Sequence, residues 1–270
     1  MSESDNSGGQ VETTETAENG ALRTEGLTKR FGGLLAVDDV DLRVAPGELH
    51  SLIGPNGAGK TTTFNLITGV LAPDEGHVWF EGEEITDLSQ ERRPHRGLAR
   101  SFQSNQLFTD LTVLENVRIV VQTMETGTFG LNLLGAGRTK HRERAFDHLE
   151  RVGLADEHAT TAANLSHGNQ RRLGIATTLA TEPSTLLLDE PTSGMGPSET
   201  QETADMVDEL RTELDLSVLL IEHDMDIVLE TSDRITVLNG GTVVATGSPA
   251  EIRANTDVQD AYLGGMREEL

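Results

Sequence analysis

The sequence predicts an α/β protein, and three of its features indicate this class. The glycine-rich stretch GPNGAGKTT at 54–62 follows ELHSLI, which has the pattern of a short apolar strand. It precedes TTTFNLITGV, which has the pattern of a helix ending near Gly69. The unbroken apolar run in TLLLDEP at 185–191 is typical of a strand buried in a parallel sheet. Residues 22–50 instead alternate apolar and polar side chains with glycine turns, as antiparallel strands do.

The glycine-rich stretch fits the P-loop pattern G-x-x-x-x-G-K-[ST] in the strand–loop–helix setting that such a loop requires. Its glycines allow backbone N–H groups to curl around phosphate oxygens, and the helix N-terminus adds positive potential. Lys60 can reach the β- and γ-phosphates of a nucleoside triphosphate, and the Thr61 hydroxyl can coordinate Mg²⁺. A chance glycine turn is the alternative. The nucleotide contacts that we expect here are Gly54, Pro55, Asn56, Gly57, Ala58, Gly59, Lys60, Thr61 and Thr62.

Two adjacent acids close the second apolar run, where a parallel sheet presents its ligands. Asp189 is placed to hold Mg²⁺, and Glu190 is placed to polarise the water that attacks the γ-phosphate. The two acids need different tasks, because one is neutralised by the metal and the other must accept a proton. The alternative is a surface acid pair that only ends the strand.

The string LSHGNQRR at 165–172 comes directly before a helical pattern and predicts a second helix N-terminus that can bind an anion. Ser166 is a good N-cap, and Gly168 permits close approach of the backbone. A single bound nucleotide has no use for two such sites. We therefore expect a head-to-tail dimer in which this helix start closes on the nucleotide of the partner.

These motifs, taken in order, resemble those of the ATP-binding subunits of ABC transporters over about residues 22–265. LSHGNQ resembles the signature LSGGQ, and TLLLDE resembles the Walker B strand. The resemblance implies ATP and Mg²⁺ as cofactors and an α/β P-loop NTPase fold of the ABC ATPase type. That fold has an antiparallel β subdomain, a RecA-like core and a helical subdomain, here at about 104–182. Residues 1–21 are expected to form a disordered acidic tail.

The resemblance also implies roles for residues outside the P-loop. Phe31 matches the aromatic ring that stacks on adenine, although a core phenylalanine is the alternative. Gln103 matches the glutamine that senses Mg²⁺ and links to the membrane partner, and His223 matches the histidine that contacts the γ-phosphate. The catalytic set is thus Glu190, His223 and Gln103, the metal set is Thr61, Gln103 and Asp189, and the partner-nucleotide contacts are Ser166, Gly168, Asn169 and Gln170.

Two residues depart from the family pattern. His167 stands where the signature has glycine, which can stiffen the loop, although Gly168 remains beside it. Gly196 stands where PTSGMGP at 191–197, the D-loop, normally carries Asp or Asn. The usual side-chain contact across the dimer is therefore in doubt, and Ser193 and the backbone remain to make it.

The stretches KRFGGLLAVDDV, EHDMDIV and NTDVQDAYLGG resemble those of branched-chain amino acid importers. This implies a chain bound to the cytoplasmic face of the plasma membrane. Its implied partners are integral-membrane permeases, a second ATP-binding subunit, identical or different, and an extracytoplasmic solute-binding protein. Phe108, Leu111 and Val113 are apolar candidates for the permease groove. Urea importers and lipopolysaccharide-export ATPases share parts of this pattern. Soluble ABC ATPases of translation or DNA repair, and simple P-loop kinases or GTPases, are further alternatives.

The composition limits which of these functions are possible. The 270 residues carry 45 Asp and Glu against 21 Lys and Arg, a formal net charge of −24, which argues against nucleic-acid binding through a basic patch. This balance resembles that of proteins from halophilic archaea, although an ordinary acidic bacterial protein is the alternative. There is no cysteine, and hence no disulfide or thiolate site. No apolar stretch is long enough to span a membrane.

The remaining segments complete the expected organisation. HVWFEGEEIT at 77–86 and GLARSFQ at 97–103 are expected to continue the antiparallel sheet, and residues 112–182 to be mostly helical. ETGTFGLNLLGAGRT at 125–139 is expected to be an insertion near the membrane-domain contact, with a plain surface loop as the alternative. Residues 183–240 return to alternating strands and helices, and 242–265 add a hairpin strand and short helices.

Overall fold

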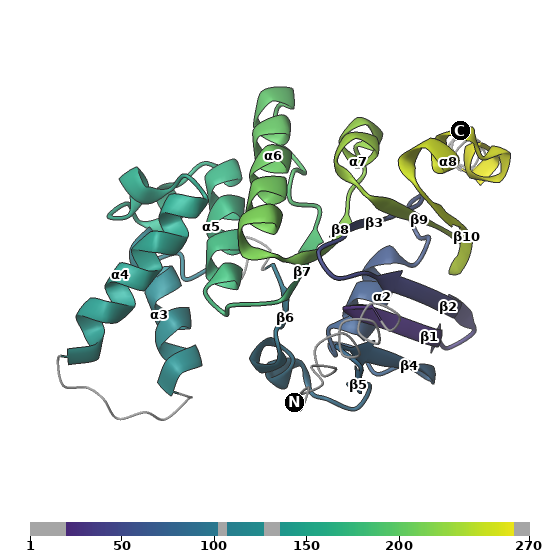
Figure 1. Cartoon of the computed structure of the whole chain (residues 1–270), viewed down its shortest axis with the longest axis horizontal. Coiled ribbons are helices and arrows are strands. Elements are labelled where there is room, and N and C mark those ends of the chain that lie inside the picture. Colours follow the sequence, from purple (N-terminus) through teal and green to yellow (C-terminus); the bar gives the residue numbers. More distant parts are fainter. Residues whose placement is uncertain (1–19, 102–106, 127–135, 262–270) are drawn as a thin grey trace, which may run out of the picture. The chain divides into compact units, whose positions relative to one another are not determined.

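The computed structural model describes residues 20–101, 107–126 and 136–261, and the chain divides into two compact units (Figure 1). The first unit comprises Met1–Ser89 and Ser232–Leu270, and the second comprises Gln90–Thr231. Residues 1–19 of the expected tail, Gln103, and 127–135 of the expected insertion lie outside the described residues.

An antiparallel sheet in the first unit confirms the prediction from alternation. Its order is β2-β1-β4-β5, and the turn at Gly32 and Gly33 pairs Phe31 with Leu34. Every inward residue of the second strand after Ala36 is buried, including Val37, Val40, Leu42 and Val44. The bounds are β1 (Leu22–Phe31), β2 (Leu34–Val44), β4 (Glu75–Phe80) and β5 (Glu83–Glu84).

The same unit holds the strand that leads into the P-loop. β3 (Leu49–Ile53) is wholly buried and pairs in parallel with β9 (Arg234–Asn239), which pairs antiparallel with β10 (Thr242–Gly247). The P-loop helix α2 (Lys60–Ile67) ends two residues before the predicted Gly69. The C-terminal hairpin strand and short helices are also confirmed, with α8 (Pro249–Ala254) capped by Ser248 and followed by a helix at 256–261.

The second unit contains three parallel strands in the order β8-β7-β6 and most of the helices. Helix α5 packs against α3 and α4, and α6 packs against α7 (Figure 1). The helical patterns predicted within 112–182 and the alternation within 183–240 are confirmed. The bounds are β6 (Leu98–Arg100), α3 (Val113–Thr126), α4 (Ala136–Arg151), α5 (His167–Leu179), β7 (Thr185–Asp189), α6 (Pro197–Leu214), β8 (Ser217–Ile221) and α7 (Met225–Thr231).

One predicted pairing is wrong. The segment GLARSFQ at 97–103 does not extend the antiparallel sheet, because its strand β6 pairs in parallel with β7, with Leu98 opposite Thr185. The left-handed Gly97 (φ 98°) turns the chain at this point, and its carbonyl accepts the N–H groups of Ser184 and Thr185. Alternation of apolar and polar side chains indicates that a segment is extended, but it does not indicate which strand lies beside it.

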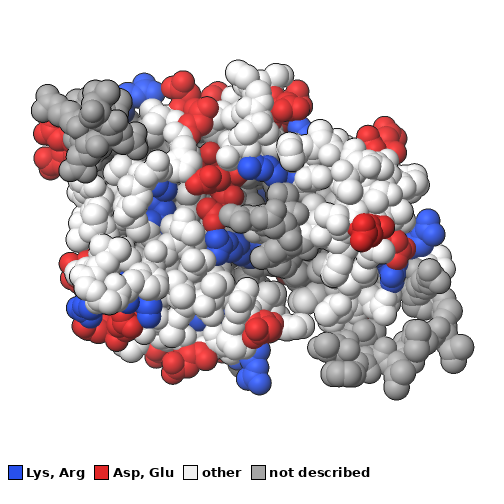
Figure 2. Space-filling view, turned by 180° about the vertical axis from the view of Figure 1, so that it is seen from behind, with Lys and Arg blue, Asp and Glu red and all other residues white. Residues whose placement is uncertain are grey.

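Side chains of both signs lie on the surface shown in Figure 2, where Lys and Arg are scattered among Asp and Glu and form no single basic patch. In the part of the chain that the structure covers, no helix is both long and apolar enough to cross a bilayer.

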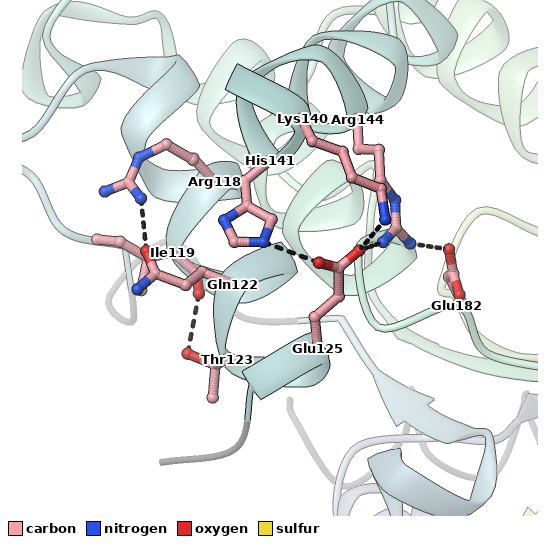
Figure 3. Close-up of polar contacts among 9 residues, drawn as sticks. All are labelled: Arg118, Ile119, Gln122, Thr123, Glu125, Lys140, His141, Arg144 and Glu182. Carbon is pink, nitrogen blue, oxygen red and sulfur yellow. Dashed lines mark hydrogen bonds and ion pairs between the residues drawn. The ribbon is translucent and has the colours of Figure 1, made fainter. Parts of the chain in front are cut away.

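A polar cluster joins the C-terminal turn of α3 to α4 (Figure 3). The Glu125 carboxylate accepts from His141 Nε2 at 2.8 Å and contacts both Lys140 and Arg144. Arg144 also reaches Glu182. Glu125 is about a quarter exposed, at 26%, so these contacts link the C-terminal turn of α3 to α4 but are partly screened by solvent.

Candidate active site

The P-loop is a turn that only glycine can make at two of its positions. A Cβ on Gly54 would lie 2.1 Å from the Leu238 carbonyl oxygen, and one on Gly59 would lie 2.6 Å from that of Ala36. Gly59 also has a φ of 103° as the residue before α2, in the left-handed region that disfavours a side chain. Packing alone therefore requires glycine at these two positions.

The Lys60 side chain folds back over the loop. Its Nζ donates to the carbonyl oxygens of Gly54 at 2.6 Å and Pro55 at 3.0 Å, and the residue is only 6% exposed. The ammonium group is thus held beside the loop whose backbone would surround a phosphate. Asn56, Gly57 and Thr61 are exposed, Pro55, Gly59 and Thr62 are half-buried, and Ala58 is buried.

Phe31 ends β1 at the hairpin turn, and its ring is 47% exposed. The Lys29 ammonium lies 5.9 Å from the centre of that ring. The alternative that Phe31 is a core phenylalanine is therefore wrong, and a flat apolar surface is left open to a stacking partner.

In the second unit, the carboxyl ends of neighbouring parallel strands bring the predicted acids and histidine together. Asp189 is the last residue of β7 and lies opposite Ile221 at the end of β8. Beyond these strand ends, Glu190 Oε1 lies 2.5 Å from Nε2 of His223. A carboxylate and an imidazole that the sequence separates by 33 positions are thus in direct contact.

Glu190 is held by its backbone as well as by its side chain. Its N–H donates to the Ile221 carbonyl at 2.9 Å, and its own carbonyl accepts from Nη1 of Arg171 at 3.0 Å. Its φ of 50° is unusual for a residue with a side chain and costs on the order of 1–3 kcal/mol. Such strained residues concentrate at functional sites, where the surrounding contacts maintain them.

The start of α5 has the predicted cap. Ser166 Oγ accepts the N–H of Asn169 at 3.2 Å, and the Ser166 carbonyl accepts that of Gln170 at 2.9 Å. Ser166 and His167 are exposed, so the helix start is open to solvent and the departure at His167 fills no core position. A Cβ on Gly168 would meet no atom closer than 3.6 Å, so packing within this chain does not itself require glycine there.

Two arginines to which the sequence motifs assign no role hold these residues. Arg100 on β6 contacts the Asp189 carboxylate, and Arg171, in the second turn of α5, binds the Glu190 carbonyl. Both lie inside or beside recognised motifs, RSFQ and LSHGNQRR, but only the fold shows that they converge on the acids at the end of β7.

The residues fit the chemistry of Mg²⁺. Asp189 offers carboxylate oxygens on a side chain that is only 5% exposed, and Thr61 offers a hydroxyl oxygen. Mg²⁺ prefers such oxygen ligands and commonly binds through one or two protein groups, waters and substrate phosphates. Within the described residues, no group of three or more His, Asp or Glu could hold a metal by itself.

Comparison with known families matches residues 37–193 to the family described as "ABC transporter". Residues 242–267 match the family described as "Branched-chain amino acid ATP-binding cassette transporter". The chain is 45% identical over 248 residues to the high-affinity branched-chain amino acid transport ATP-binding protein LivG of Escherichia coli, and the match covers 90% of this chain and 97% of LivG.

Solved structures agree in fold. The ADP conformation of MJ1267, an ATP-binding cassette of an ABC transporter, superposes with a TM-score of 0.80 at 33% identity, covering 90% of this chain and 98% of MJ1267. A dimeric post-hydrolysis structure of the cassette MJ0796 bound to ADP and Pi superposes with a TM-score of 0.72 at 27% identity, covering 84% and 98%. The predicted fold class is confirmed, whereas nothing in these matches supports the predicted halophilic source.

Proposed function

Because the chain belongs to the ABC transporter family, as an ATP-hydrolysing subunit, we propose that it energises import of leucine, isoleucine and valine across the plasma membrane. The observation that carries the solute class is the match of the C-terminal residues 242–267 to a family of branched-chain amino acid cassettes. The similarity to LivG over nearly the whole of both chains supports it. Family membership removes the kinase and GTPase alternatives.

The proposed nucleotide site combines the P-loop with the start of α5 of a second cassette. The N-terminus of α2 and the Lys60 ammonium are suited to bind the phosphates of ATP, and the exposed Phe31 ring is suited to stack on adenine. The open helix start at Ser166 supplies a second anion site, which a head-to-tail dimer brings onto the partner's γ-phosphate. The dimeric MJ0796 structure supports such an assembly.

The proposed hydrolytic step uses the Glu190 and His223 pair. Glu190 orients a water and accepts its proton as the water oxygen attacks the γ-phosphorus, and ADP leaves with its β-phosphate oxygen. The contact between Glu190 and His223 holds the carboxylate in place. The proposed role of His223 is to contact the γ-phosphate. Asp189, Thr61 and Gln103 would hold Mg²⁺, which would neutralise charge on the phosphates.

The proposed partners are integral-membrane permeases, a second ATP-binding subunit and an extracytoplasmic solute-binding protein, with this chain on the cytoplasmic face. Phe108 is 54% exposed and Leu111 is 36% exposed, as a permease contact requires. Val113 is buried, at 0% exposure, so the expectation that it lines this surface is wrong. It starts α3, where its N–H donates to the Thr160 carbonyl at 2.9 Å and its side chain packs inward.

Uptake in cells tests the solute class. A strain lacking the gene is supplied with the wild-type chain or with Lys60→Ala, and uptake of labelled leucine, isoleucine, valine and urea is measured separately. The proposal predicts that only the wild-type chain restores uptake of the three amino acids. Restoration of urea uptake alone would assign the chain to the second candidate class, which shares the same subunit architecture.

A further inference from the structure

A buried acid that is not part of the Glu190 and His223 pair contacts both turns that carry this pair. Glu222 lies between Ile221, the last residue of β8, and His223, and it is only 4% exposed. One carboxylate oxygen, Oε1, accepts the Thr192 N–H at 3.0 Å and the Thr192 hydroxyl at 2.7 Å. The other oxygen, Oε2, accepts the His223 N–H at 3.2 Å.

These contacts tie together the two turns that carry the hydrolytic pair. Thr192 follows Glu190 by two residues in the turn after β7, and His223 begins the turn after β8. Each turn therefore has a donor on the same carboxylate. A buried carboxylate without donors is strongly disfavoured, so the geometry that satisfies all three donors is well defined.

Other contacts leave this turn with little freedom. Arg171 binds the Glu190 carbonyl, and the Ser193 N–H donates to that same carbonyl at 3.3 Å. Glu190 itself is held in the left-handed region at φ 50°. A backbone in that region relaxes when its supports are removed, so loss of the Glu222 contacts is expected to move the Glu190 carboxylate relative to the imidazole.

We propose that Glu222 is a positioning residue, which fixes the separation of Glu190 and His223 by joining the turn after β7 to the turn after β8. The inference deepens the proposed function and rests on the hydrolytic roles given there to Glu190 and His223. Glu222 does not itself contact the nucleotide or the attacking water. It acts through the residues that do, and small displacements of such groups lower catalytic rates strongly.

The chain offers closely matched variants. Glu222→Gln keeps the shape but has only one oxygen, so an amide NH₂ must face either Thr192 or the His223 N–H. Thr192→Val removes only the hydroxyl donor, whereas Thr192→Ser retains it. Glu209→Gln on α6 is the control for the same chemical change, because Glu209 is exposed.

ATP hydrolysis by the purified full-length chain is measured as a function of ATP concentration, together with the melting temperature. We expect Glu222→Gln to lower kcat by about tenfold or more while KM for ATP changes by less than about twofold. Thr192→Val lowers kcat by roughly threefold or more in the same way, and Thr192→Ser and Glu209→Gln retain the wild-type rate. The Glu222→Gln change causes no further loss in a Glu190→Gln background, because both act on one step. The His223 ring NMR signals shift in Glu222→Gln.

Two results would overturn the proposal. The first is a kcat for Glu222→Gln and Thr192→Val within about twofold of wild type. The second is a loss of kcat that follows a matching fall in melting temperature and a rise in KM, which a purely structural role predicts. If Glu222→Gln does not fold, the Thr192 pair decides by the same criteria. Full activity in Glu190→Gln and His223→Ala would instead remove the roles on which the inference rests, so the two failures are distinguishable.

Discussion

Glu190 has a backbone conformation that residues with side chains rarely adopt, with φ at 50°. Its carboxylate contacts His223, its carbonyl binds Arg171, and its N–H binds Ile221. Each contact comes from a different element of the same unit. The position of the carboxylate is therefore determined by the fold around it, which is what a group that must orient a water requires.

Substitution of Gly57 and of Gly59 distinguishes two causes of instability, a left-handed backbone and a steric clash of the new side chain. Both have positive φ, at 78° and 103°, but a Cβ on Gly57 would meet no atom within 4 Å, whereas one on Gly59 would lie 2.6 Å from the Ala36 carbonyl oxygen. We expect Gly57→Ala to lower the free energy of unfolding by about 1 kcal/mol and Gly59→Ala by about 3 kcal/mol. Urea unfolding measures both. Equal losses would contradict the role of the collision.

At the residue scale, the sequence predicts which side chains form the site better than it predicts what holds them. The acids at the end of an apolar strand predict Asp189 and Glu190, and the family resemblance predicts His223. The supports Arg100, Arg171 and Glu222 cannot be found in this way. Arginine and glutamate are ordinary surface residues in sequence. The pairing of β6, β7 and β8 places Arg100 and Glu222 beside the site, and Arg171 reaches Glu190 from α5.

Helix α4 carries a histidine that predicts a pH dependence of stability. His148 is 9% exposed, and burial, followed by the nearby Arg151 charge, lowers its pKa from 6.5 to about 4. The folded chain thus keeps His148 neutral, while the unfolded chain binds a proton below about pH 6.5. The contribution of His148 to the free energy of unfolding is fully present above that pH and is lost as pH falls from about 6.5 to about 4.

We expect His148→Leu to remove about 2 kcal/mol of the decline in unfolding free energy between about pH 7 and about pH 5. Urea unfolding at a series of pH values measures this slope. His95→Leu is the control, because His95 is exposed and its replacement is expected to leave the slope unchanged. An unchanged slope in His148→Leu would contradict the neutral, buried state of that ring.

At the scale of elements, the sequence predicts which segments form helices and strands better than it predicts which strands pair. The apolar runs at 49–53 and 185–189 form buried strands, and the helices within 112–182 form where the pattern places them. Strand β6 belongs to a different sheet from the predicted one, because the sequence of so short a strand carries no information about its neighbour. The structure of a long periodic segment is determined by its own side chains, whereas the position of a three-residue strand is determined by the sheet with which it pairs.

The whole molecule carries a formal net charge of −24, and its basic side chains are scattered among acidic ones on the face in Figure 2. Repulsion among the acids opposes the compact state and is screened by salt, with a Debye length of about 10 Å at 0.1 M and about 3 Å at 1 M. We expect the melting temperature to rise by several degrees between about 0.1 M and about 1 M KCl. A melting temperature that is flat or falls over this range would contradict a destabilising role for the net charge.

We propose that ATP hydrolysis through Glu190 drives the import of branched-chain amino acids. The most direct test is uptake of labelled leucine, isoleucine and valine by the host carrying Glu190→Gln at the chromosomal locus, with Glu209→Gln as the control for the same chemical change. We expect Glu190→Gln to abolish uptake of all three amino acids while the protein remains at the membrane and binds ATP, and Glu209→Gln to show normal uptake. Wild-type uptake in Glu190→Gln, with the variant present at the membrane, would contradict it.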